Sequence, residues 1–139
     1  MNRLFVDTSA WVALTDSADR YHQRAIAFRD EIAGQRPMLT TSYVLDETYT
    51  LLLLNIGYAH TVSLKKRLDT LVAQQIIEVV WVDQPLADDA WQVFERFNTD
   101  KVWSYTDCIS YSVMRSRGLT EAFAFDHHFE QMGFVCLPR

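Results

Sequence analysis

The chain has 139 residues, of which 49% are hydrophobic and 13% aromatic. This length and hydrophobic content are enough for one folded domain and exclude a disordered protein. Its net charge of −5 argues against a surface that coats nucleic acid nonspecifically, because such surfaces are cationic. No hydrophobic run approaches the length of a membrane span, and we expect no secretory leader. We therefore predict one cytoplasmic domain over residues 1–139.

The predicted elements alternate between short hydrophobic runs and helical patterns, which is typical of a parallel α/β sheet. The predicted strands are 3–6, 38–40, 76–82, 121–125 and 134–137. Strand 76–82 is the clearest buried strand, because four β-branched residues precede Trp81. The predicted helices are 8–15, 19–35 with Asp19 as cap, 42–55, 59–75, 83–97 with Asp83 as cap, 106–117, and a helical turn at 127–132. We expect a three-layer α/β/α fold with a central, mainly parallel sheet.

Motifs of several common sites are missing from the sequence. Cys108 and Cys136 lie in hydrophobic segments and show neither Cys-x-x-Cys nor Cys/His zinc spacing, so we expect two reduced, mostly buried thiols. The first predicted strand ends in Asp7-Thr8-Ser9 instead of a Gly-x-Gly-x-x-Gly or P-loop sequence. This disfavours a nucleotide-binding Rossmann protein.

Four acidic residues are candidates for one shared site: Asp7, Glu47, Asp107 and Asp126. Asp7 and Asp126 each follow a predicted strand, and open parallel sheets bind ligands beyond the carboxyl ends of their strands. Asp107, at a helix start, can lie at the same edge. Each aspartate taken alone has an ordinary explanation as a helix cap or helix-start residue. The hypothesis therefore depends on all four occurring at one predicted edge.

Glu47 is the hardest of the four to explain as a structural residue. At 100° per residue it shares a side of its helix with Val44, Leu51 and Leu54, and we expect this side to face the core. Asp46 points nearly opposite. A carboxylate on a core-facing stripe needs a partner.

Converging carboxylates predict a hard divalent cation. They repel one another by about 1 kcal/mol per close pair in water and about 4 kcal/mol at an intermediate dielectric, and only protons or a cation relieve that repulsion. Carboxylate oxygens suit Mg²⁺ and Mn²⁺ alike. Two such ions would add four positive charges to the net −5 and leave −1, which helps phosphate to approach. We predict a metal-dependent nuclease that hydrolyses phosphodiesters with metal-activated water and no side-chain nucleophile.

Residues near the four acids are candidates for supporting roles. The hydroxyls of Thr8, Ser9 and Thr106 are expected to orient carboxylates or hold a metal-bound water, although helix-start chemistry explains them equally well. His127 and His128 directly follow Asp126 and are candidates for phosphate contact, with a solvated pair as the alternative. The candidate cations for phosphate, chosen because they are near Asp107 in sequence, are Lys101, Arg115 and Arg117.

Four short motifs, in this order along nearly the whole chain, resemble those of the PIN-domain family, and more narrowly the VapC-like toxins of toxin–antitoxin pairs. The motifs are Phe5-Val6-Asp7-Thr8-Ser9-Ala10-Trp11, Ser42-Tyr43-Val44-Leu45-Asp46-Glu47-Thr48, Ser104-Tyr105-Thr106-Asp107-Cys108 and Ala124-Phe125-Asp126-His127-His128-Phe129. The resemblance implies that Asp7, Glu47, Asp107 and Asp126 bind the metal. One departure is that His127 and His128 stand where family members often carry a further acidic or amide residue.

The resemblance also implies partners. It predicts an endoribonuclease acting on RNA, a cytoplasmic homodimer, and a small antitoxin that inserts an arginine or a hydrophobic tail into the acidic site. Tyr49 and Leu53 form a second apolar side on the helix 42–55, as expected for a partner or dimer contact, although a deeply buried helix would show the same pattern.

Two rival functions stay open. A phosphatase could use Asp7 as the nucleophile of an aspartyl-phosphate, but Ser9 stands where such enzymes have a second aspartate. A non-catalytic PIN-like module could keep the fold and bind RNA or protein, but it would have no reason to retain Glu47 on an apolar face.

Overall fold

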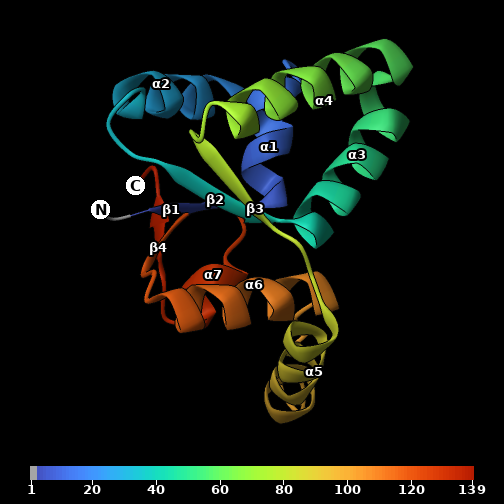
Figure 1. Ribbon diagram of the computed structural model, residues 1–139, viewed down its shortest axis with the longest axis vertical. Coiled ribbons are helices and arrows are strands. Elements are labelled where there is room, and N and C mark those ends of the chain that lie inside the picture. The colour runs from blue at the N-terminus through green and yellow to red at the C-terminus, as the bar shows by residue number, and fades with distance from the viewer. Residues whose placement is uncertain (1–2) are drawn as a thin grey trace.

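Five short strands form one sheet at the centre of the computed structural model, which describes residues 3–139 (Figure 1). The strands are β1 (Leu4–Val6), β2 (Met38–Thr41), β3 (Ile77–Val80), β4 (Glu121–Phe123) and β5 (Val135–Leu137). Their spatial order is β3-β2-β1-β4-β5, and every neighbouring pair is parallel. The prediction of a parallel sheet is therefore confirmed.

Helices cover both faces of this sheet and complete the three predicted layers. They are α1 (Thr8–Thr15), α2 (His22–Ile32), α3 (Ser42–Ile56), α4 (Tyr58–Ala73), α5 (Gln84–Phe97), α6 (Tyr105–Arg117) and α7 (His128–Gln131). Helices α1, α2 and α4 lie on one side, and α6 and α7 lie on the other (Figure 1). Helix α5 packs against α6 farther from the sheet. Within residues 3–139, no helix combines the length and hydrophobicity needed to cross a membrane.

The central strand β1 is buried on both of its faces. All three residues of β1 are fully buried, which suits a strand enclosed between two helical layers. Aromatic rings pack on each side: Phe5 lies 6.1 Å from Phe129 of α7, and Phe123 of β4 meets Phe28 of α2 edge-on at 4.9 Å between ring centroids. These contacts place the carboxyl ends of β1 and β4 on a rigid base.

The strand order creates a switch point between β1 and β4. The chain builds β2 and β3 on one side of β1 and adds β4 and β5 on the other. Helical connections diverge at such a point and leave space beyond the carboxyl ends of the strands. Asp7 follows β1 directly, and Asp126 follows β4 after two intervening residues. The fold therefore puts two of the candidate acids at this switch point.

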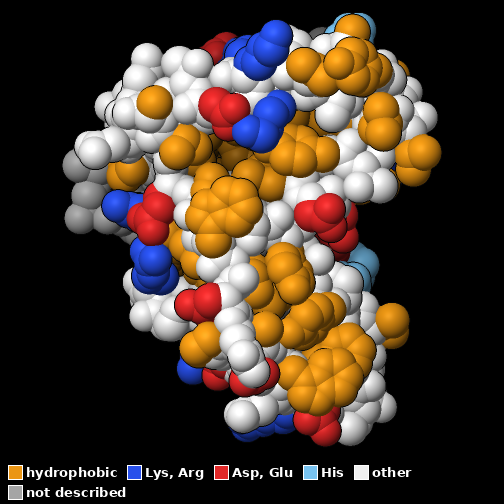
Figure 2. All heavy atoms as spheres, turned by 45° about the vertical axis from the view of Figure 1, so that its right-hand side comes forward, with side chains coloured by type: hydrophobic (Ala, Val, Ile, Leu, Met, Phe, Trp, Pro, Cys, Tyr) orange, Lys and Arg blue, Asp and Glu red, His pale blue; other side chains and the backbone are white. Residues whose placement is uncertain are grey.

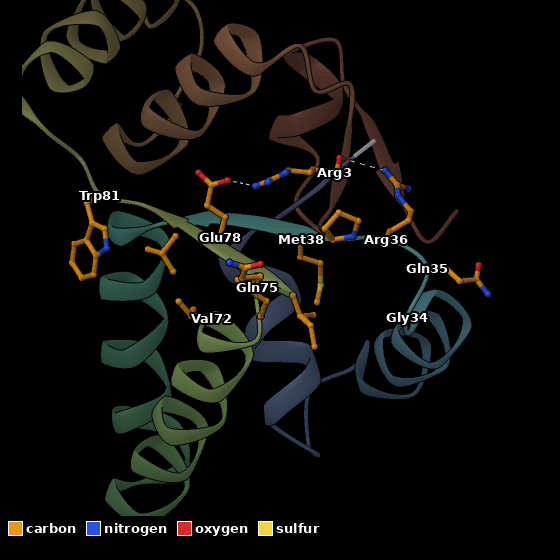
Figure 3. A pocket seen from close by; sticks show the side chains of 13 residues that line it. Arg3, Gly34, Gln35, Arg36, Met38, Val72, Gln75, Glu78 and Trp81 are labelled. Carbon is orange, nitrogen blue, oxygen red and sulfur yellow. Dashed lines mark hydrogen bonds and ion pairs between the residues drawn. The ribbon is translucent and has the colours of Figure 1, made fainter. Parts of the chain in front are cut away.

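A different hollow, of about 940 Å³, borders the amino ends of β1 and β2 and runs along β3 as far as Trp81 (Figure 3). Its charges are paired. Glu78 of β3 accepts hydrogen bonds from Arg3 and from Arg117, the latter at 3.0 Å, and Arg36 forms an ion pair with Glu121 at 3.1 Å. Because none of the four candidate acids lines it, this hollow is separate from the acidic residues.

Several predicted element boundaries differ from the structure. Strand β3 is an edge strand and only partly buried, and the flanking Ile76 and Trp81 are 39% and 75% exposed, so the prediction of a buried strand at 76–82 was wrong. Its β-branched residues favour a strand but carry no information on its place in the sheet. Helix α2 begins at His22, because Asp19 caps a turn by accepting a hydrogen bond from the Tyr21 N–H (2.8 Å). Strand β4 ends at Phe123 instead of Phe125.

Candidate active site

Asp7 is a buried carboxyl at the first turn of α1. Asp7 is 3% exposed, and its carboxylate accepts hydrogen bonds from the Ser9 hydroxyl at 2.7 Å and from the Ser9 N–H at 3.2 Å. Burial raises the pKa of Asp7 from 3.8 to about 7, and the neighbouring charge of Asp107 contributes to this increase. The hydrogen bonds from Ser9 act in the opposite direction. Without a cation, Asp7 is therefore an acid that ionises near neutral pH.

Ser9 ties the ends of β1 and β4 together. Its hydroxyl donates to Asp7 and accepts the Phe125 N–H at 2.9 Å. The Asp7 N–H in turn donates to the Phe123 carbonyl at 3.1 Å. The expectation that Ser9 orients a carboxylate thus has a direct geometric basis.

Asp107 lies in the first turn of α6 and faces the same space. Its N–H donates to the hydroxyl of Ser104, the helix cap, at 3.0 Å. The pKa of Asp107 is raised, chiefly by burial and then by the charge of Asp126, while a hydrogen bond from His128 lowers it. Ser104 was not among the predicted site residues. Its signal is in the sequence, since Ser104-x-x-Asp107 is the spacing of a helix-capping box.

Asp126 and His128 complete the cluster from the other side. The His128 N–H donates to Asp126 Oδ1 at 2.9 Å, which folds the chain back at the start of α7. His128 Nδ1 lies 3.0 Å from Asp107 Oδ2 and 3.3 Å from Asp126 Oδ1. Ligand atoms of Asp107, Asp126 and His128 all lie within 4.8 Å of one another. Three groups from two segments therefore converge on a space that would suit one ion.

The donor set fits a divalent cation. Asp7, Asp107 and Asp126 interact through their charges, and burial withholds from Asp7 and Asp107 the water that would otherwise stabilise those charges. The amino ends of α1 and α6 both lie here, and the dipoles of these helices also favour anionic groups at this position. Oxygen ligands of this kind suit Mg²⁺ or Mn²⁺.

Glu47 occupies a different position from the one its helical stripe predicts. The buried residues of α3 are Val44, Leu45, Thr48 and Leu52, whereas Leu51 is 39% and Leu54 76% exposed. The predicted core stripe through Leu51 and Leu54 was therefore wrong, because the outer part of α3 extends beyond the sheet and packs against α4 (Figure 1). Glu47 is half-buried and lies outside the group formed by Asp107, Asp126 and His128 in the described chain.

Glu47 nevertheless lies near the edge that carries the aspartates. The Thr8 hydroxyl, next to Asp7, donates to the Val44 carbonyl at 3.4 Å, one turn before Glu47. Tyr43 meets Tyr105 of α6 at 5.9 Å between ring centroids. The Thr8 hydroxyl thus joins α1 to α3, and the hydrogen bond of Thr8 to the Asp7 carboxyl comes from its backbone. Thr106 contributes its carbonyl to the Ser110 hydroxyl.

The predicted phosphate contacts divide into two groups. Arg115 and Arg117 lie in the last turn of α6, roughly 12–15 Å along the helix from Asp107 by the rise per residue, and Arg117 pairs with Glu78. The structure thus places both arginines away from the acids, because residues that are close in sequence can lie at opposite ends of one helix. Lys101 lies before α6, at the end that carries Asp107, and pairs with Asp100 at 3.2 Å. His127 is 74% exposed at its side chain, and His128 belongs to the cluster itself.

Other cations lie beside Asp126 instead. A hollow of about 330 Å³ is lined by Asp126, His127, Arg24 and Arg139, among others. Within it Tyr21 and Phe125 stack at 4.5 Å, and the Arg24 guanidinium lies 5.7 Å from the Phe125 ring centroid. Sequence reasoning missed this group because its members come from segments about one hundred residues apart.

Both cysteines are free, as predicted, and Cys136 lies beside the site. Burial raises the pKa of Cys108 and of Cys136 to about 11 each, and the charges of Asp7 and Asp126 contribute for Cys136. Both thiols are thus protonated near neutral pH, and a protonated thiol is a weak nucleophile. This agrees with a site whose chemistry depends on carboxylates.

Known proteins of similar sequence or fold give a consistent result. The protein named 23S rRNA-specific endonuclease VapC20, from Mycobacterium tuberculosis strain H37Rv, is 34% identical over 135 residues, which are 95% of each chain. The crystal structure of M. tuberculosis VapC20, described as a sarcin-ricin loop cleaving toxin, matches with a TM-score of 0.82 and 31% identity, covering 95% of this chain and 96% of that one. DNA-bound VapBC from Salmonella typhimurium shares the fold at 16% identity and a TM-score of 0.64, covering 98% and 96% of the chains.

The family model described as PIN domain matches residues 4–135, a span that contains all four predicted acids. The motifs, the parallel sheet and the acidic residues beyond the ends of β1 and β4 agree with this match. The chain therefore belongs to the PIN-domain family.

Proposed function

We propose that the protein is a divalent-metal-dependent endoribonuclease that hydrolyses RNA phosphodiesters. The observation that carries the proposal is the convergence of Asp107, Asp126 and His128 near the switch point between β1 and β4, with the buried Asp7 close enough to Asp107 for their charges to interact. A cluster of partly buried carboxylates is costly unless it holds a cation. The relative with 34% identity is named an endonuclease specific for 23S rRNA, which supports ribosomal RNA as the substrate class.

Each residue has a defined task in this proposal. Asp7, Asp107 and Asp126 would hold the ion, Mg²⁺ or Mn²⁺, and Glu47 would complete the site or orient a water from α3. When bound, such an ion would neutralise phosphate charge and favour ionisation of an attacking water. Ser9 holds the Asp7 carboxylate through its hydroxyl, and Ser104 fixes the turn that presents Asp107. No side-chain nucleophile takes part.

The RNA would pass along the hollow beside Asp126. Arg24 and Arg139 line it and offer positive charge for the phosphates, and the Tyr21–Phe125 pair offers aromatic surface for bases. Lys101 and His127 would extend these contacts on the exposed side of the cluster. This placement replaces Arg115 and Arg117 as candidate phosphate contacts.

The proposed cellular role is that of a toxin in a toxin–antitoxin pair. VapC20 is described as a toxin, and the Salmonella structure is that of VapBC bound to DNA. We propose a cytoplasmic homodimer whose activity a small antitoxin suppresses. A basic residue of that antitoxin would suit the acidic site, because it would compensate the same charges as a cation.

The test is cleavage of a panel of structured RNAs, with 23S rRNA fragments and tRNA included, in Mg²⁺, in Mn²⁺ and in EDTA. Cutting that requires a divalent ion and falls at least about a hundredfold in Asp107→Asn is the expected result. Glu47→Gln is compared with Asp46→Asn, an exposed neighbour on α3, and only the former should reduce the rate.

Two results would contradict the proposal. Cleavage that persists in EDTA would remove the metal from the mechanism. A phosphoenzyme that hydroxylamine releases, without RNA cleavage, would instead establish an aspartyl-phosphate phosphatase with Asp7 as nucleophile.

A further inference from the structure

We propose that His128 binds the metal directly through Nδ1, so that the site has mixed oxygen and nitrogen ligands and prefers Mn²⁺ to Mg²⁺. The proposal rests on the metal site described above and assigns it one further ligand. It starts from a simple observation: Nδ1 is within 3.3 Å of a carboxylate oxygen of both Asp107 and Asp126.

These distances agree with neighbouring positions around one ion. An octahedral ion with bonds of about 2.1 Å separates adjacent ligand atoms by roughly 3.0 Å and opposite ones by roughly 4.2 Å. The two contacts of Nδ1 are 3.0 and 3.3 Å, and the three ligand atoms lie within 4.8 Å of one another. The groups are thus already spaced for shared coordination, with small adjustments of side chains.

The imidazole is held in this position by its surroundings. The His128 N–H donates to Asp126 Oδ1 at 2.9 Å, and the next residue, Phe129, is fully buried against Phe5. The His128 side chain is 25% exposed, so it borders the site without closing it. The adjacent His127 shows the contrast, because its side chain is 74% exposed and its Nδ1 lies 3.9 Å from Asp126.

A hydrogen bond alone is a poorer explanation of this arrangement. Nδ1 carries at most one proton and can donate it well to one acceptor, yet two carboxylate oxygens share its environment. A cation contacting all three atoms satisfies each of them and also relieves the repulsion between Asp107 and Asp126. In that state Nδ1 offers its lone pair, and Nε2 carries the proton.

A nitrogen ligand changes which ion the site favours. Mg²⁺ prefers an all-oxygen shell, whereas imidazole is a good ligand for first-row transition metals. Replacing His128 should therefore weaken Mn²⁺ binding more than Mg²⁺ binding.

The test is Mn²⁺ binding to the full chain without RNA, by titration calorimetry and by pulsed electron paramagnetic resonance, which detects a directly bound ¹⁴N nucleus. We expect ¹⁴N coupling in the unaltered protein and in His127→Ala, and its loss in His128→Ala. The Kd for Mn²⁺ should rise more than about tenfold in His128→Ala. Removal of a residue that only hydrogen-bonds a metal ligand can weaken metal binding by a similar factor, so the Kd alone does not identify a ligand. The coupling therefore distinguishes ligation from hydrogen bonding.

His128→Gln is measured in parallel, so that a folding defect of the alanine variant does not decide the result. It should also lose the ¹⁴N coupling while circular dichroism matches that of the unaltered protein. The inference is overturned if the unaltered protein binds Mn²⁺ without ¹⁴N coupling, or if the coupling survives in both His128 variants.

RNA cleavage separates this inference from the proposed function. Metal-dependent cutting without ¹⁴N coupling would overturn only the role of His128. Coupling that depends on His128 in a protein that cuts no RNA would uphold the ligand and overturn the nuclease.

Discussion

At the scale of single residues, the site is built on carboxyl groups that the fold makes costly to ionise. Asp7 is enclosed at the junction of β1 and α1, and its pKa of about 7 results mainly from burial, with Asp107 adding to it. An increase from 3.8 to about 7 corresponds to roughly 4 kcal/mol at pH values above that range. The protein thus gives up folding free energy to place a carboxylate where a cation can use it.

This cost predicts an unusual dependence of stability on pH. Between about pH 4 and pH 7, the unfolded chain ionises Asp7 while the folded chain keeps it protonated, so the folded state binds more protons. Stability in EDTA should therefore fall as pH rises through this window and level off above it. In urea unfolding, the free energy of unfolding of Asp7→Asn should rise relative to that of the unaltered protein by roughly 4 kcal/mol between pH 4 and pH 8.

The exposed Asp46→Asn change serves as the control and should show no such trend. Excess Mn²⁺ should reduce the gain of Asp7→Asn, since the ion stabilises the ionised carboxylate. A difference between Asp7→Asn and the unaltered protein that stays constant with pH would contradict the assignment.

At the scale of elements, the two ends of α6 have different roles. Its amino end presents Asp107 to the site, and its carboxyl end carries Arg115 and Arg117 toward the amino ends of the strands, where Arg117 meets Glu78. The cations that do border the acids come from the start of α2 and from the end of the described chain. Substrate binding should therefore depend on α2 more than on the last turn of α6.

Arg24→Ala tests this division of roles. The substitution is made in an Asp107→Asn background, which should not cut RNA. Loss of the Arg24 guanidinium should weaken RNA binding severalfold. It should also reduce the slope of log Kd against log salt by about 0.7, the value for one phosphate contact on a single strand. Arg115→Ala, an exposed arginine of α6, is the matched control and should leave both quantities unchanged. Equal losses in the two variants would argue against the hollow beside Asp126 as the RNA path.

The sequence was sufficient for the architecture and for most of the candidate site. Alternation of strands and helices indicated the parallel sheet, and position after a strand indicated Asp7 and Asp126, because the rule that places ligands at strand ends needs no side-chain detail. Helix α1 was predicted with its observed bounds, and Gly118, with φ of 68°, ends α6 where expected. Periodic patterns and local capping chemistry were the sources of this success.

What the sequence could not supply depends on contacts between distant segments. The periodicity of α3 allowed more than one apolar side, and only the packing of α3 against α1 and α4 decides that Leu52 is buried and Leu54 exposed. Likewise, nothing local distinguishes His128 from His127, because the difference is the approach of Asp107 from another helix. Strand β3 was placed too deep for the same reason.

At the scale of the whole molecule, the acidic site lies beyond the carboxyl ends of the strands and leaves other surfaces available to partners. Hydrophobic side chains are prominent on the side where α3, α4 and α5 lie (Figure 2). The exposed apolar residues at the corner between α3 and α4 are Leu51, Leu53, Leu54 and Tyr58, and Leu54 and Tyr58 are 76% and 74% exposed. Such a group is larger than isolated surface hydrophobics and favours a protein contact.

If the proposed homodimer forms through this corner, a charge at its centre should dissociate it. Sedimentation equilibrium of the unaltered chain should give twice the monomer mass of 16.2 kDa, and Leu54→Asp should shift it to one copy. Val102→Asp introduces the same charge at a residue that is 86% exposed elsewhere and should stay dimeric. A dimer that tolerates Leu54→Asp would place the contact on another face.

The hydroxyl of Ser9 joins groups that the ribosome makes at widely separated times. It contacts Asp7 near the start of the chain and the N–H of Phe125 near its end, and the histidine between the other two acids comes three residues later. A nascent chain shorter than this carries Asp7 without the partners that organise it. Fragments released before residue 128 would therefore lack the assembled site, and a cell making this proposed RNA-cutting protein would be exposed to it only once the chain has been made as far as His128.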